Sequence, residues 1–151
     1  MDTRKRFTHL LFIVFVVSLC CSHVSYAETA PCALLTQNQV STTLGASVGA
    51  GSPIVNTGCS WTTTGAPRIL VTVSMQNEKM FAGAKLSALP NATKTPISGL
   101  GDEAIFTGVE SFSSLWIRRG TKFFLVRIYG LPVSEAQTKL KALATNVLSK
   151  L

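Results

Sequence analysis

The clearest alternation of apolar and polar positions lies in the segment RILVTVSMQ, residues 68–76. Ile69, Val71, Val73 and Met75 are separated by mostly polar residues, with Leu70 as the exception. A period of two predicts a strand that buries one face. The preceding CSWTT segment, from Cys59, predicts the start of another strand.

A second alternating segment, SSLWIRRGTKFFLVRIYG, predicts a β-hairpin. Gly120-Thr121 fits a two-residue type II′ turn, which needs glycine at its first central position. This turn pairs Arg119 with Lys122 and continues to Leu115 opposite Val126. One face is then uniformly apolar, with Leu115, Ile117, Phe124, Val126 and Ile128. The other face mixes Trp116, Phe123, Leu125 and Tyr129 with Arg118 and Arg127.

Three segments have helical signals. Thr36 and Gln39 form a capping box, and this helix should end near Leu44, where Gly45 can adopt a left-handed conformation. Asn77 can cap a short second helix. That helix would carry Met80, Phe81 and Ala84.

The third helix should begin at Ser134, with Ser134 and Gln137 as its capping box. An apolar stripe at helical spacing follows, formed by Ala136, Leu140, Leu143, Ala144, Val147, Leu148 and Leu151. The segments GASVGAGSPIVNTG and 87–96 are expected to be loops. The element order predicts an α+β domain over residues 28–151, with an antiparallel sheet of about four to six strands and helices packed on it.

The N-terminal segment has the pattern of a secretory signal peptide over residues 1–27. Basic residues at 4–6 precede an apolar run from Phe7 to Leu19, and Ser25 and Ala27 supply the small residues of a cleavage site. We therefore expect a periplasmic or extracellular protein without a stable transmembrane segment after cleavage. An uncleaved anchor is the alternative, but a spanning helix needs about 20 mostly apolar residues. Leu19 before Cys20 lacks the small residue that lipidation requires.

Cleavage after Ala27 would remove both histidines and two of the four cysteines. Cys32 and Cys59 would remain, and an even pair in an exported chain predicts a disulfide. We expect neither a metal site nor a cofactor, because no cluster of ligating residues remains. The net charge of +7 would fall to +5 on cleavage, because eleven Lys/Arg and six Asp/Glu would remain. Apart from Arg118, Arg119 and Lys122 these basic residues are scattered, without the stripe of a nucleic-acid-binding protein.

The segment PISGLGDEAIF, residues 96–106, permits three interpretations. Its G-x-G-x-x-A spacing suggests a dinucleotide fingerprint, but no strand precedes it and no helix follows it. Asp102 and Glu103 could be an acid–base pair, but neighbours in an extended segment point to opposite sides. We therefore predict a glycine turn leading into a strand, in which Gly99, Gly101 and Asp102 are structural and Asp102 accepts hydrogen bonds from turn amides.

The segments PCALLTQNQVSTTLG, GCSW and GLGDEA, the hairpin and the C-terminal ALATNVL resemble a family of small exported bacterial proteins. These are mainly actinobacterial envelope lipoproteins, grouped under a domain of unknown function. The resemblance implies a PsbP-like fold, with an antiparallel sheet between helices. It also implies a cysteine pair at Cys32 and Cys59 and an acidic glycine turn at residues 99–104. It implies no known activity, and the missing lipidation signal departs from the family pattern.

We predict a non-enzymatic module that binds a small molecule or an envelope protein. Without histidine, nucleophilic catalysis would need a variant such as Ser–Lys, and no S-x-x-K motif occurs after residue 27. The candidate surface is the mixed hairpin face, with Trp116, Arg118, Phe123 and Arg127, which suits a planar or anionic group. Alternatively, a helix covers that face and the arginines reach solvent at its edge. A structural or envelope-assembly role and a histidine-free hydrolase are the other functional alternatives.

Overall fold

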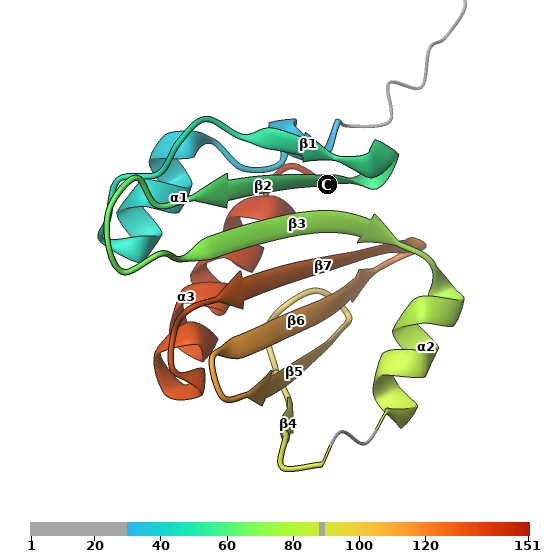
Figure 1. The fold of residues 1–151 in the computed structure, drawn as a ribbon. Coiled ribbons are helices and arrows are strands. Elements are labelled where there is room, and N and C mark those ends of the chain that lie inside the picture. The colour runs from blue at the N-terminus through green and yellow to red at the C-terminus, as the bar shows by residue number, and fades with distance from the viewer. Residues whose placement is uncertain (1–29, 88–89) are drawn as a thin grey trace, which may run out of the picture.

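A computed structural model describes residues 30–87 and 90–151. The signal peptide predicted over residues 1–27 lies outside the described residues. The described chain forms an α+β domain with a seven-stranded antiparallel sheet, three α-helices and two short 3₁₀ helices (Figure 1). The α+β class with an antiparallel sheet and packed helices is thus confirmed.

The elements follow the chain from η1 to α3. The helices are η1 (Pro31–Ala33), α1 (Gln37–Leu44), η2 (Val55–Thr57), α2 (Glu78–Leu86) and α3 (Val133–Leu148). The strands are β1 (Ser52–Ile54), β2 (Gly58–Thr62), β3 (Leu70–Gln76), β4 (Thr93–Pro96), β5 (Glu103–Val109), β6 (Phe112–Arg119) and β7 (Lys122–Tyr129). Their order across the sheet is β1-β2-β3-β7-β6-β5-β4.

The predicted count of four to six strands is wrong, because two segments expected to be loops contain the edge strands β1 and β4. Both strands are short, largely exposed and contain a proline, Pro53 or Pro96. Proline lacks the amide that a central strand needs and is tolerated at a sheet edge. Neither segment has the apolar alternation by which a buried strand is recognised.

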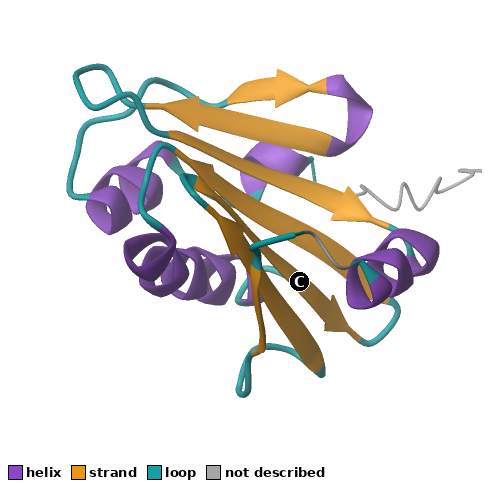
Figure 2. Cartoon of the chain, turned by 60° about the horizontal axis from the view of Figure 1, so that its bottom comes forward, coloured by secondary structure: helices purple, strands orange, loops and turns teal. Residues whose placement is uncertain are grey.

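The two faces of the sheet have different coverings. On one face, which we call the inner face, α1 and α3 pack over the main core, which includes Leu115, Ile117, Phe124, Val126 and Ile128. On the opposite, outer face, α2 packs over a smaller apolar cluster. Figure 2 shows α1 and α3 side by side and α2 apart from them.

The hairpin register is confirmed at every predicted pair, from Arg119 opposite Lys122 to Leu115 opposite Val126. Gly120 has a φ of 58°, while Thr121 has no positive φ. A positive φ at the first central residue alone is what a type II′ turn requires. The turn therefore sets which side chains share each face of β6 and β7.

The predicted starts of α1 and α2 are confirmed. Thr36 Oγ1 accepts the amide of Gln39 at 3.1 Å, and Gln39 Oε1 accepts the amide of Thr36 at 2.9 Å. Gly45 ends α1 with a φ of 71°. Asn77 Oδ1 accepts the amide of Met80 and caps α2.

The predicted capping box of α3 is wrong, because the helix begins at Val133 with Pro132 as its N-cap and no side-chain cap. Pro132 has an extended conformation, φ −57° and ψ 146°, from which the chain enters the helix two residues earlier than a cap at Ser134 would give. Ser134 is therefore inside the first turn. Five stripe residues are nevertheless buried on the inner face: Ala136, Leu140, Leu143, Ala144 and Val147.

The disulfide predicted between Cys32 and Cys59 is present. It joins η1 to β2, with Cys59 fully buried. The closed loop contains α1 and β1, so the bond fixes about the first quarter of the domain to the sheet. None of the helices within 30–87 and 90–151 is long and apolar enough to cross a membrane.

Candidate ligand-binding site

A row of polar residues crosses the whole outer face of the sheet. Directly paired residues of antiparallel strands share one face. One set of directly paired residues takes one residue from each of the seven strands. From β1 to β4 across the sheet, its members are Ser52, Ser60, Thr72, Arg127, Ser114, Thr107 and Lys94. We call this set the polar row. It carries hydroxyl groups and two cations and includes no carboxylate.

Apolar and aromatic residues flank the polar row over β5, β6 and β7. Ile105, Trp116 and Leu125 are paired on one side of it. Phe112 and Tyr129 are paired on the other, with their ring centroids 4.9 Å apart. Arg127 thus lies between two aromatic groups, its guanidinium carbon 5.9 Å from the ring centroid of Phe112 and 6.0 Å from that of Trp116. This distance allows cation–π attraction to both rings.

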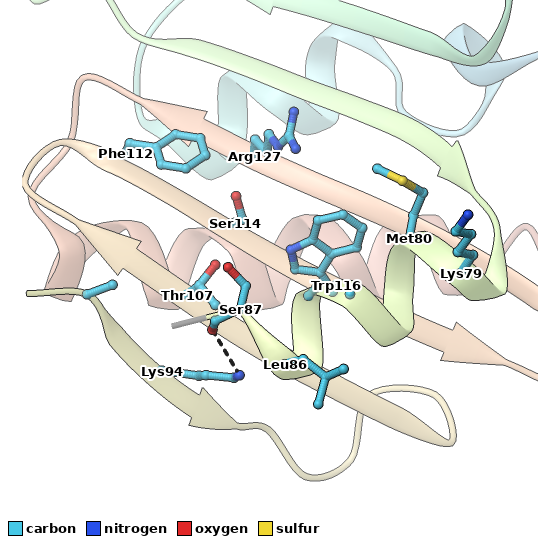
Figure 3. Close-up of a pocket in the computed structure, with 13 residues that line it drawn as sticks. Lys79, Met80, Leu86, Ser87, Lys94, Thr107, Phe112, Ser114, Trp116 and Arg127 are labelled. Atoms are coloured by element: carbon cyan, nitrogen blue, oxygen red, sulfur yellow. Dashed lines mark hydrogen bonds between the residues drawn. The ribbon is translucent and has the colours of Figure 1, made fainter. Parts of the chain in front are cut away.

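A cavity of about 600 Å³ lies between α2 and this part of the sheet (Figure 3). Sites for small organic molecules have volumes of about 300–1,000 Å³. The sheet contributes Lys94, Thr107, Phe112, Ser114, Trp116 and Arg127. The α2 side contributes Lys79, Met80, Gly83, Ala84, Leu86, Ser87 and, from the following turn, Ala92. The lining therefore combines apolar surface with hydroxyls and cations.

Helix α2 covers one half of the mixed hairpin face. Phe81 packs with Trp116 and Leu125 in the outer cluster, and its ring centroid is 5.5 Å from that of Phe123. Lys85 Nζ is 2.6 Å from Glu103 Oε1, which links the helix to β5. The sequence left open whether a helix covers this face. The structure has Trp116 and Phe123 under α2, with the cavity beside them.

Arg127 has an unused donor in this cavity region. Its Nε is buried and has no hydrogen-bond partner among the described residues. A buried donor without an acceptor costs about 1–3 kcal/mol.

The four residues proposed from sequence do not form one site. Trp116 and Arg127 line the cavity. Phe123 does not line it and packs against Phe81 instead. Arg118 lies outside the lining, with its Nη1 3.7 Å from Asp102 Oδ2 and its Nε 3.7 Å from Glu103 Oε2.

Other cavity residues were missed at the sequence level. Ser114 lies opposite Arg127 in the hairpin register, so the predicted turn contained enough information to find it. Thr107 and Lys94 required the pairing of β5 and β4, and β4 had no recognisable pattern. The contribution of α2 depends on how that helix docks, which no local signal encodes.

The GLGDEA turn is held by contacts to the hairpin. Gly99 and Gly101 have positive φ values of 79° and 62°. Asp102 Oδ2 accepts the amide of Gly120 at 2.6 Å, so this carboxylate binds the turn between β6 and β7 rather than its own turn. Neither Asp102 nor Glu103 lines the cavity.

The expectation that Asp102 and Glu103 point apart is not met at their carboxylates, because both contact Arg118. Asp102 precedes β5, so strand alternation does not govern it. The hydrogen bond from Lys85, together with the charges of Lys85 and Arg118, holds the pKa of Glu103 below its usual range. Both acidic groups are therefore occupied in ion pairs.

No family model, curated protein or solved structure matches the chain. Within the part of the chain that the structure describes, no group of three or more His, Cys, Asp or Glu side chains could hold a metal ion.

Proposed function

We propose that this protein is an exported, non-enzymatic binding module for a small organic anion with a flat apolar body. The observation that carries the proposal is Arg127, an arginine that lines the cavity and is flanked by two aromatic rings. Arginine suits carboxylate and phosphate groups because its planar guanidinium donates several hydrogen bonds in a fixed geometry.

The cavity separates the two parts of such a ligand. The anionic group would lie on the polar row, where Ser114 and Thr107 can donate hydrogen bonds beside Arg127 (Figure 3). The apolar body would pack against Trp116 and the side chains of α2. Lys79 and Lys94, at the edges of the cavity, add positive potential that attracts anions.

The chemistry of the lining favours binding over turnover. A serine or threonine nucleophile needs an adjacent base. No side chain that lines the cavity is a histidine, a cysteine or a carboxylate. The Nζ of Lys94 donates to the carbonyls of Lys85 and Ser87, at the end of α2. The hydroxyls of Ser114 and Thr107 are thus suited to hydrogen bonding.

We further propose that residues 1–27 direct export to the periplasm or the extracellular space. The disulfide supports this, because such bonds persist in oxidising compartments. We also propose kinship with the small exported envelope proteins of PsbP-like fold. Support comes from the capping box at Thr36, the Cys32–Cys59 bond and a sheet with helices on both faces.

Native mass spectrometry of the protein isolated from the cells that make it tests the proposed function. We expect a retained organic acid on the wild type and on the control Lys141→Gln, which alters an exposed lysine of α3. Arg127→Gln should lose it, since hydrogen bonds to charged groups contribute about 1.5–3 kcal/mol. Wild-type protein recovered without any small molecule or bound protein would instead favour a structural role.

A further inference from the structure

The cavity has an apolar and cationic rim. Among the described residues, four large apolar side chains are exposed: Ile54 at 40%, Val55 at 85%, Met80 at 51% and Leu86 at 85%. Met80 and Leu86 both belong to α2 and line the cavity, and both are exposed. Both exposed apolar side chains thus border one cavity, and such groups around a cavity commonly mark an interaction surface.

Lysines accompany these apolar side chains. Lys79 and Leu86 are seven residues apart in α2, so they lie on the same side of the helix. Lys94 joins them from β4, with its ammonium group at the end of α2. Glu78 is seven residues from Lys85 and therefore lies on the Lys85 side, where Glu103 is also found. The rim, which we define as Lys79, Met80, Leu86 and Lys94, thus contains cations and no carboxylate.

We propose that this rim docks on the surface of an anionic lipid bilayer, with the cavity mouth against the lipid. Apolar side chains of a surface helix enter the boundary between headgroups and acyl chains, while lysines attract anionic headgroups. Each lysine near such a surface contributes about a fivefold increase in affinity.

A bilayer fits this rim better than a protein partner does. Stable protein interfaces bury about 1,200–2,000 Å² around an apolar centre. Two apolar side chains on a nine-residue helix offer much less than that. They are sufficient for reversible attachment when charge assists. This inference does not depend on Arg127 or on the identity of the proposed ligand.

Co-sedimentation with lipid vesicles tests the docking surface. The protein is mixed with vesicles of phosphatidylcholine alone or of equal parts phosphatidylcholine and phosphatidylglycerol. We expect binding to the anionic vesicles, weakened about tenfold by Leu86→Ser, since burial of an apolar side chain has that order of effect. Met80→Ser and Lys79→Gln should each weaken binding about fivefold.

Two control variants distinguish binding through the rim from nonspecific binding to vesicles. Val55→Ser removes an equally exposed apolar side chain of η2, and Lys141→Gln removes a lysine of α3. Both should bind vesicles as the wild type does. Because every variant keeps the same N-terminus, residual binding through that segment cancels in the comparison. Equal losses from Val55→Ser and Leu86→Ser, or binding unchanged in all rim variants, would overturn the proposal.

Measuring both anion retention and vesicle binding on the same variants tests the docking surface separately from the proposed ligand site. Arg127→Gln should lose the organic anion but keep vesicle binding, whereas Leu86→Ser should weaken vesicle binding whether or not the organic anion is retained. Loss of vesicle binding in Arg127→Gln, with the rim variants unaffected, would place the lipid contact elsewhere and refute the rim.

Discussion

Gly101 lies where the chain passes closest to the hairpin. Its φ is positive, and a Cβ at this position would overlap the carbonyl oxygen of Arg118. Gly99 also has a positive φ, but nothing lies within 4 Å of the place its Cβ would occupy. The two glycines of the GLGDEA turn thus differ in one respect, which is the space around them. The backbone requirement is shared, whereas the close approach belongs to Gly101 alone.

This difference gives a matched pair of variants. Gly99→Ala should lower the free energy of unfolding by about 1 kcal/mol through left-handed strain. Gly101→Ala should lower it by about 3 kcal/mol, because overlap with Arg118 adds to the same strain. Chemical denaturation of both variants measures the two values. An equal decrease in the free energy of unfolding for both variants would show that Gly101 is not in close contact with the backbone of Arg118.

At the scale of elements, α2 is the part whose position decides the site. It rests on the outer face through Phe81, Ala84 and the Lys85–Glu103 ion pair. The lowered pKa of Glu103 means that the folded state favours the charged carboxylate. This contribution to stability is complete above the ordinary pKa of glutamate and is lost as the pH falls through the lowered pKa of the folded state.

The pH dependence can be measured against Glu103→Gln. The wild type should have a slightly higher Tm than this variant at neutral pH, since partly exposed ion pairs contribute little. The difference should disappear under acidic conditions, below the lowered pKa. Glu110→Gln, in the turn between β5 and β6, is the control. A Tm difference between wild type and Glu103→Gln that persists in acid would contradict the role of the ion pair.

At the scale of the whole molecule, the sequence predicted the features that neighbouring residues determine, namely turns, helix caps and buried strands. The glycine at position 120 fixes the hairpin register, and the caps at Thr36 and Asn77 fix two helix starts. Edge strands β1 and β4 were missed because they bury almost nothing and so have no apolar period.

The candidate site depends on longer-range arrangement. Arg118 and Arg127 share a face and look equivalent in sequence. Pairing with β5 places Arg118 opposite Glu103, however, whereas Arg127 belongs to a row of hydroxyls. The docking of α2 then encloses a cavity beside one arginine and leaves the other in ion pairs. The sequence could therefore identify the mixed face of the hairpin, but it could not show which half of that face lines the cavity.

The central claim is that Arg127 holds an anion in the cavity beside α2, and a pair of fluorescent dyes tests it most directly. Anilinonaphthalene sulfonate and N-phenylnaphthylamine have closely similar ring systems, and only the first carries a negative charge. We predict that the sulfonate binds the wild type more tightly, and that Arg127→Gln lowers its affinity at least about tenfold while leaving the uncharged dye unchanged. Arg118→Gln, outside the cavity, should behave as the wild type does. Equal affinity of the sulfonate for wild type and Arg127→Gln would contradict the account.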